Sequence, residues 1–162
     1  MRIVGGLPRS RMVEWGILAI VIVVLVGIFG HYVRVIQGQG ERAAVVSTLG
    51  ALRTALVIDH LQRAANAGGA GQSSAVVNPF MVLQTLPLNY GGEMSAAQAV
   101  LAPPGRWVFD SQCGCIGYAP QDSAWHSSAL GVAVLWFKVS SGPGPRVLTA
   151  QAPYVWQGIE LR

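Results

Sequence analysis

Two cysteines separated by one glycine, Cys113 and Cys115, are the residues of this chain best suited to covalent chemistry. In an oxidising compartment, two such thiols favour a disulfide. Residues i and i+2 of a flat strand lie about 6.6 Å apart at Cα, near the upper limit for a bridge, and a turn at Gly114 could close the gap with strain. The pair is a candidate disulfide, and three interpretations stay open: a structural bridge, two free thiols, or a strained bridge that exchanges with other thiols.

The segment DSAWHSS holds the three residue types of a hydrolase triad in Asp122, Ser123 and His126. Triads draw their members from separate elements and add an oxyanion hole, whereas these three are neighbours in one polar segment. Zinc needs two ligands beyond the cysteine pair, and no His or Cys stands at a suitable spacing. The sequence also lacks a Gly-Lys phosphate-binding motif. We therefore expect no catalytic residue, no cofactor and no metal site.

An apolar run from Trp15 to Val33 dominates the N-terminal part of the chain. As a helix it would be roughly 28 Å long, close to the hydrocarbon thickness of a bilayer. It has no polar face, and aromatic residues stand near both of its ends, as in membrane-interface belts. Bulky residues follow the apolar core where a signal peptidase needs small ones. The pattern predicts a retained transmembrane helix over residues 15–36.

The charges around this run predict its orientation. Residues 1–14 are basic, with three arginines against the single carboxylate of Glu14, which places them in the cytoplasm and the rest of the chain outside, in the periplasm of a bacterium. Residues 1–42 hold five arginines and two glutamates, so they carry +3 of the net charge of +4. Nucleic-acid binding is not expected, since no Lys/Arg cluster forms a phosphate footprint. Glu14 either lies at headgroup level beside Arg11 or needs another cation, because a charge in the apolar zone is costly.

Residues 37–67 predict an amphipathic helix with two faces, which continues the apolar helix through a weak point at Gly38 and Gly40 and stops at Gly68-Gly69. One face is bulky and should dock on the globular domain; it is formed by Val45, Leu49, Leu52 and Leu56. The other face is small and would allow close approach of another helix. The alternative is that these alanines are present only because alanine favours helix formation. It is formed by Ala43, Ser47, Ala51 and Ala55.

The remaining residues predict a small sheet domain. Residues 68–105 read as irregular, with one short helical turn that Ser95 and Gln98 would cap. Residues 106–162 contain the strand-like runs RWVFD, CIGYAP, GVAVLWFKV, PRVLTAQ and YVWQGIEL. Short connections between these runs favour an antiparallel sheet, and the helix over 37–67 is the candidate to cover one face. The fold class expected is α+β.

Two strings and this order of elements resemble a known family. NPFMVLQTLPLNYGGE is similar to an Asn-Pro…Pro-x-Asn-Tyr-x-Gly-Glu segment, and GRWVFDSQCGCIGYAP to a Trp-x-Phe-Asp hairpin with a Gly-x-x-Tyr strand. Both occur in type IV pilins and type II secretion pseudopilins, including minor and MSHA-type pilin-like proteins. The resemblance implies a pilin-like fold and a non-enzymatic subunit of a pilus or secretion system. Its partners would be other subunits, bound through the N-terminal helix, and an inner-membrane assembly platform.

The resemblance also gives Glu14 a role. Prepilins carry Glu at the fifth position of the mature chain, a place that Glu14 would hold if the mature chain began at Ser10. In the family this carboxylate is thought to pair with the N-terminal amine of an adjacent subunit. Trp125, Trp136 and Trp156 would supply subunit contacts if exposed, or core if not. The alternative function is an uncleaved, membrane-anchored periplasmic scaffold or thiol-active accessory protein that does not polymerise.

Overall fold

A computed structural model describes residues 9–66, 78–128, 131, 133–140 and 144–161. The chain divides into two compact units, Met1–Gln39 and Gly40–Arg162. The helix α1 (Arg9–Asn66) contributes to both and includes Gly38 and Gly40, so the unit boundary falls at the glycine pair predicted as a weak point. The predicted helix end at Gly68-Gly69 lies outside the described residues.

The described residues of the N-terminal unit form the first part of α1. Its large apolar side chains are exposed, including Trp15, Leu18 and Phe29. The most apolar 18-residue window of the helix has a mean hydropathy of 2.7, and none of it is buried within the chain. In the described part of the chain, α1 is the one helix that is long and apolar enough to cross a membrane.

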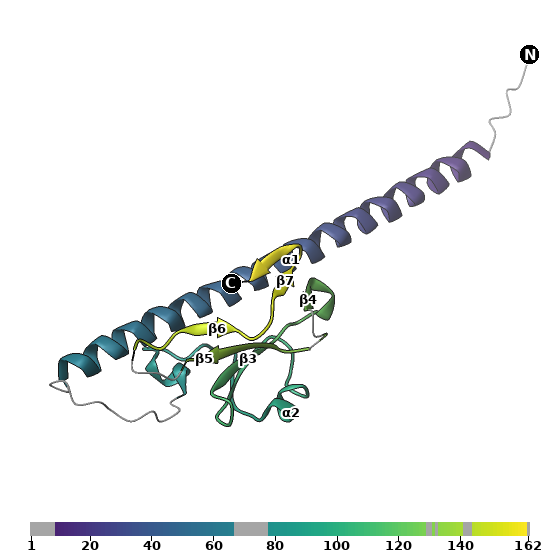
Figure 1. The fold of residues 1–162 in the computed structure, drawn as a ribbon. Coiled ribbons are helices and arrows are strands. Elements are labelled where there is room, and N and C mark those ends of the chain that lie inside the picture. Colours follow the sequence, from purple (N-terminus) through teal and green to yellow (C-terminus); the bar gives the residue numbers. More distant parts are fainter. Residues whose placement is uncertain (1–8, 67–77, 129–130, 132, 141–143, 162) are drawn as a thin grey trace, which may run out of the picture. The chain divides into compact units, whose positions relative to one another are not determined.

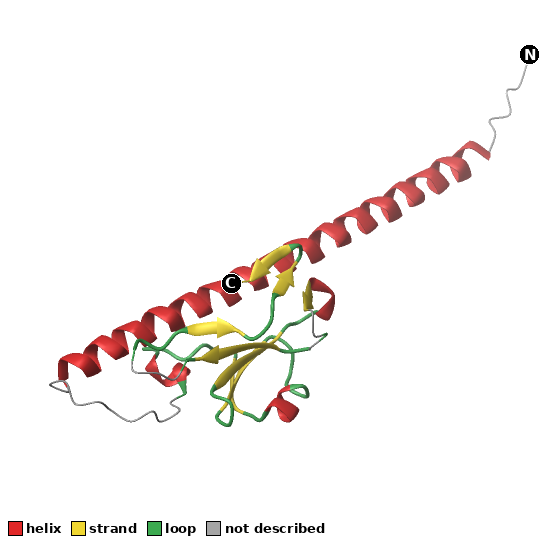
Figure 2. Ribbon diagram, in the orientation of Figure 1, coloured by secondary structure: helices red, strands yellow, loops and turns green. Residues whose placement is uncertain are grey.

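The C-terminal unit contains two sheets (Figures 1 and 2). The larger one has the strand order β1-β2-β3-β5-β6, built from β1 (Tyr90–Glu93), β2 (Arg106–Asp110), β3 (Cys115–Ala119), β5 (Leu135–Val139) and β6 (Leu148–Ala150). The smaller one has the order β4-β7-β8, built from β4 (His126–Ser128), β7 (Tyr154–Trp156) and β8 (Ile159–Leu161). The short helices are η1 (Pro79–Val82), α2 (Ala96–Ala99) and η2 (Ser123–Trp125).

The α+β class is confirmed, but the prediction of one antiparallel sheet is wrong. β1 pairs in parallel with β2, so the larger sheet is mixed, and three further strands form a separate antiparallel sheet. β1 lies in the segment predicted to be irregular. Its sequence YGGE has low strand propensity, and it becomes a strand through its pairing with the edge of β2, where Tyr90 aligns with Trp107.

The last predicted run, YVWQGIEL, is a hairpin rather than one strand. β7 and β8 flank Gln157 and Gly158, whose φ values are 47° and 81°. Two consecutive residues with positive φ form the tight turn that joins twisted antiparallel strands. The other runs give one strand each, and RWVFD corresponds to β2 throughout. β4 was not predicted, because HSS lacks the apolar alternation of a strand.

The core lies between the C-terminal half of α1 and the sheets. The predicted bulky face of α1 is at most 1% exposed over Val45, Leu49, Leu52 and Leu56. The first three belong to the core cluster that includes side chains of both sheets, which confirms that this face packs on the sheet domain. Trp156 is fully buried in this unit, so of the two roles expected for it, subunit contact or core, the structure shows core. Trp125 and Trp136 are half-buried.

The opposite face of the larger sheet has a smaller core under α2. It contains Val108 and Ala119 from the sheet and Ala99 from α2, with the Trp136 indole packed against them. A Cβ at Gly117 would lie 2.8 Å from Cζ3 of Trp136, so only glycine allows the indole to cover β3 here. Ser95 caps the N-terminus of α2, as predicted: Oε1 of Gln98 accepts hydrogen bonds from the Ser95 N–H (3.0 Å) and hydroxyl (3.1 Å).

Candidate assembly surface and disulfide site

Glu14 lies near the start of α1 with its side chain exposed. Among the described residues it forms no hydrogen bond or ion pair, so Arg11 does not neutralise it here. A carboxylate next to an apolar helical surface is poorly placed in a bilayer unless a cation approaches it. Glu14 is therefore a group that a second molecule, or a lipid headgroup, can still pair with.

The small face of α1 is largely open to solvent. Ala43, Ser47 and Ala51 are exposed, whereas Ala55 is half-buried. The reason is geometric: four residues turn an α-helix by about 400°, so a strict spacing of four drifts 40° per step towards the buried face. The predicted series is thus open at its N-terminal end and partly covered at Ala55.

A straighter small surface runs along the side of α1 that points away from the core. It keeps the spacings of four, three and four residues, and is formed by Ala43, Ser47, Gly50 and Thr54. Nothing lies within 4 Å of a Cβ built at Gly50, and the Thr54 hydroxyl donates to the Gly50 carbonyl oxygen at 3.0 Å. Sequence reasoning missed Gly50 and Thr54, although the alternating spacing applied to the bulky face would have found them.

Glu41 ties the first turn of α1 within the C-terminal unit to the sheet. Its Oε1 accepts hydrogen bonds from the Tyr118 hydroxyl at 2.7 Å and from the backbone N–H of Gln121 at 2.9 Å. Burial raises the pKa of Tyr118, and its hydrogen bond to Glu41 and the charge of Glu41 raise it further. The sequence carries no signal for this contact, because 77 residues separate the two partners.

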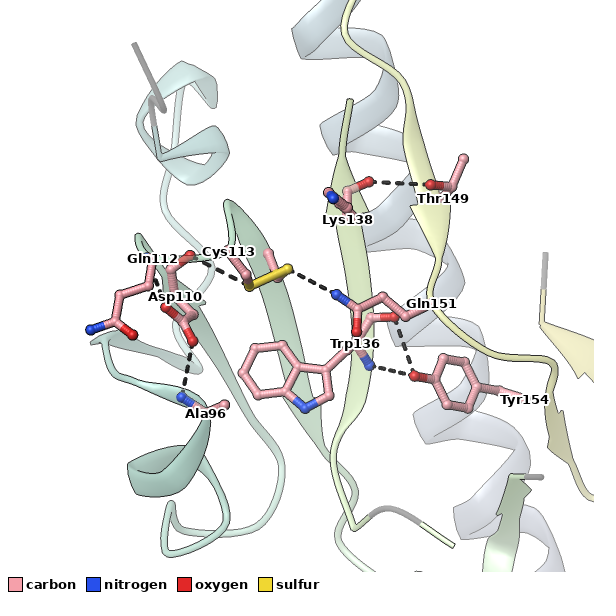
Figure 3. Close-up of a disulfide and its surroundings, with 10 residues drawn as sticks. Ala96, Asp110, Gln112, Cys113, Trp136, Lys138, Thr149, Gln151 and Tyr154 are labelled. Carbon is pink, nitrogen blue, oxygen red and sulfur yellow. Dashed lines mark hydrogen bonds between the residues drawn. A yellow bond between two sulfur atoms is a disulfide. The ribbon is translucent and has the colours of Figure 1, made fainter. Parts of the chain in front are cut away.

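The structure joins Cys113 and Cys115 in a disulfide at the tip of the β2–β3 hairpin (Figure 3). Their Cα atoms are 5.2 Å apart, shorter than the flat-strand spacing, because Gly114 takes a φ of 66° and turns the chain. The two halves of the bridge differ in environment: Cys113 is exposed, whereas Cys115 is completely buried. The bridge can therefore be approached from the side of Cys113.

Polar residues of neighbouring segments lie beside the disulfide (Figure 3). The side-chain amide of Gln151, just after β6, donates to Sγ of Cys115 at 2.9 Å. Lys138 on β5 and Asp110 on β2 are the cross-strand partners of Cys115. The carboxylate of Asp110 is buried, and its two oxygens accept from the N–H groups of Ala96 and Gln112, each at 2.9 Å.

The residues considered for catalysis have structural positions. Oδ1 of Asp122 accepts from the N–H of Ala124 at 2.9 Å and caps η2, which contains Ser123. His126 is on β4, where its ring lies beside the indole of Trp156 at a tilt of 34°, with centroids 6.1 Å apart. In the part of the chain that the structure describes, no group of three or more His, Cys, Asp or Glu side chains could hold a metal ion.

Comparisons with protein-family models, with curated proteins and with solved structures find no match to this chain. The resemblance to pilins therefore depends on the two sequence strings and the order of elements. The open small face of α1, the exposed apolar helix and the disulfide are the features from which a function can be argued.

Proposed function

We propose that this chain is a non-enzymatic, pilin-like subunit of a type IV pilus or type II secretion system, of the minor-pilin or pseudopilin type. The N-terminal part of α1 anchors the subunit in the bacterial inner membrane, with the N-terminus in the cytoplasm and the C-terminal unit in the periplasm. The same helix then packs against other subunits, with the help of an inner-membrane assembly platform. The chain itself performs no chemistry in this process.

One observation carries the proposal: the apolar window of α1 has no buried residue within its own chain. Exposed apolar surface costs about 25 cal/mol per Å² in water, and this helix is apolar on every side. It is stable only when lipid or other apolar helices surround it. A subunit that moves from a membrane into a helical filament core satisfies both conditions in turn.

The C-terminal half of α1 supports the assembly role. One side of it is buried in its own core, while the opposite side presents small residues such as Ala43, Ser47 and Gly50. Small residues let two helix backbones approach closely, which strengthens van der Waals contact. In the assembled state, Glu14 pairs with a cation of the neighbouring subunit, which removes the cost of an unpaired charge.

The alternative, an uncleaved periplasmic scaffold or thiol-active accessory protein on the same anchor, is favoured by one observation. The disulfide is exposed at Cys113 and has an amide donor at Cys115. Such a protein needs the membrane helix but no contact between copies. The two functions therefore differ in whether the outer side of α1 meets another subunit.

Cysteine crosslinking in native membranes tests this difference. We expect Ser47→Cys to give crosslinked dimers with a short bis-maleimide, because Ser47 lies on the open small face. The matched control is Val46→Cys, which is 44% exposed but about 100° further round the helix, where crosslinks should be few. The experiment is done without added thiols, so that the Cys113–Cys115 bridge stays closed and offers no thiol to the maleimide.

Adding Glu14→Gln to the Ser47→Cys variant should reduce the dimer yield, because the intersubunit charge pair is lost. Far-UV circular dichroism should show an unchanged fold. The assembly role is wrong if Ser47→Cys forms no dimers in cells whose pilus or secretion machinery is active. Equal dimer yields at Ser47 and Val46 would indicate random collision in the membrane instead of a defined interface.

A further inference from the structure

We propose that the Cys113–Cys115 bridge is a thiol–disulfide exchange site in which an external thiolate attacks Sγ of Cys113 and Cys115 is the leaving sulfur. The partner is a thiol-bearing molecule, either a small thiol or a protein with an exposed cysteine. This site is independent of subunit assembly, because it lies at the β2–β3 hairpin tip and not on α1.

The direction of attack follows from burial. A thiolate approaches a disulfide along the S–S axis and on the side opposite the leaving sulfur. Cys113 is an exposed residue at the hairpin tip, so we place the attack at its sulfur, with Cys115 as the leaving side. Cys115 is 0% exposed, which closes the reverse approach. Exchange should therefore be specific for one of the two sulfurs.

The surroundings of Cys115 suit a leaving thiolate. The Gln151 side chain already donates to its Sγ at 2.9 Å, and this hydrogen bond strengthens when the sulfur becomes anionic. Lys138 is the cross-strand partner of Cys115 on β5, and among the described residues no carboxylate forms an ion pair with its ammonium group. Because directly paired residues share one face of a sheet, the Lys138 side chain can bring its ammonium group towards the leaving sulfur, where a cation favours the thiolate over the thiol.

Asp110 is the opposing charge at this site, because it is the partner of Cys115 on β2. Its two carboxylate oxygens accept from the N–H groups of Ala96 and Gln112, which disperses its negative charge away from the sulfur. The carbonyl oxygen of Asp110 lies 3.9 Å from Sγ of Cys113. Once the bridge is reduced, this carbonyl oxygen can accept a hydrogen bond from the Cys113 thiol.

The two steps balance in atoms and electrons. In the first, R–S⁻ bonds to Sγ of Cys113, the Cys113–Cys115 bond breaks, and Cys115 leaves as a thiolate. In the second, another R–S⁻ attacks the R sulfur of the mixed disulfide and releases the Cys113 thiolate. The products are R–S–S–R and the reduced pair, which takes up the two protons given up by the two R–SH. The N–H of Val139 donates to the Gly114 carbonyl oxygen at 3.2 Å and holds the turn in place throughout.

Mass spectrometry of the full-length chain in mild detergent tests the proposal. The protein is treated briefly with reduced glutathione and quenched with N-ethylmaleimide, and the modified peptide is then fragmented. We expect glutathione on Cys113 and N-ethylmaleimide on Cys115. Adducts on Cys115, an equal distribution between the two, or no reaction while the urea-unfolded chain reacts would each overturn the proposal.

The matched variants Gln151→Met and Gln112→Met test the role of the amide donor. Both variants replace an exposed glutamine near the bridge with methionine, which is of similar size but has no amide. Only Gln151 contacts the leaving sulfur. Loss of a charge-assisted hydrogen bond should slow glutathione reduction about three- to tenfold in Gln151→Met, with little change in Gln112→Met. Equal rates of glutathione reduction in the two variants would refute the role of Gln151. If Gln151→Met folds poorly, the position of the glutathione adduct in the unmodified chain still decides the proposal.

Discussion

Replacing Tyr118 with phenylalanine should change how the stability of the C-terminal unit responds to alkaline pH. The Tyr118 side chain is 3% exposed, and its hydroxyl donates to Oε1 of Glu41 at 2.7 Å. A hydrogen bond to a charged acceptor contributes about 1.5–3 kcal/mol. At pH 8, Tyr118→Phe should therefore lower the free energy of unfolding by about 2 kcal/mol.

The pH dependence follows from the raised pKa of Tyr118. Burial is its main cause, followed by the hydrogen bond to Glu41 and the charge of Glu41. Because the folded chain holds the phenolic proton more tightly than the unfolded chain does, this stabilisation is complete below the ordinary pKa of 10 and is lost as the pH rises through the raised value. At pH 11 the unfolded chain has lost the proton about ten times in eleven, which lowers the free energy of unfolding by about 1.4 kcal/mol.

The gap between the unmodified chain and Tyr118→Phe should thus narrow from about 2 kcal/mol at pH 8 to about 0.6 kcal/mol at pH 11. Tyr90 and Tyr154 also have raised pKa values, chiefly through burial, but they are present in both proteins and cancel in the comparison. The measurement is urea unfolding of the full-length chain in mild detergent, followed by the fluorescence of Trp107 and Trp156, which are 1% and 0% exposed.

Glu41→Gln is the matched control for this experiment. It keeps an acceptor for the Tyr118 hydroxyl but removes the charge, so burial alone should still raise the pKa and preserve the alkaline loss of stability. If the unmodified chain and Tyr118→Phe give parallel curves from pH 8 to 11, then Tyr118 ionises equally well in the folded state. That result would refute both the buried hydroxyl and its contact with α1.

Two further pairs of variants test the packing on each face of the larger sheet, again by urea unfolding. Leu52→Ala removes a 0% exposed side chain between α1 and the sheet and should cost about 2–5 kcal/mol, whereas Val46→Ala, at a position 44% exposed, should stay within about 0.5 kcal/mol. Gly117→Ala should cost about 1–3 kcal/mol, because the new Cβ would lie 2.8 Å from Cζ3 of Trp136. Gly50→Ala has open space and should gain up to about 1 kcal/mol from helix propensity. If the two variants of a pair lose similar amounts of unfolding free energy, the packing described for that face is wrong.

For the disulfide, the local sequence identifies the two cysteines but not their surroundings. The Cys-Gly-Cys spacing is sufficient to nominate Cys113 and Cys115 as a disulfide that a turn at Gly114 could close. It says nothing about which sulfur is exposed. The groups around Cys115 come from later parts of the chain: Lys138 is its partner on β5, and Gln151, just after β6, donates a hydrogen bond to its sulfur.

The sequence by itself determined the features that depend on local period and hydrophobicity. The apolar run, the buried stripe through Leu49 and Leu52, the capped turn at Ser95 and the strand RWVFD are all visible there, because each is encoded within one or two turns or one strand. Helical and strand periods differ enough that such segments can be recognised without their partners.

Tertiary structure alone decided which segments pair and which side chains are covered. The glycine-rich β1 is a strand because β2 offers it an edge, Trp156 is core because two sheets close over it, and Glu41 meets Tyr118 across 77 residues. Each of these depends on contacts between segments far apart in the chain, where the free energy of pairing outweighs local preference. Local sequence patterns do not predict such contacts, so they are seen only in the folded molecule.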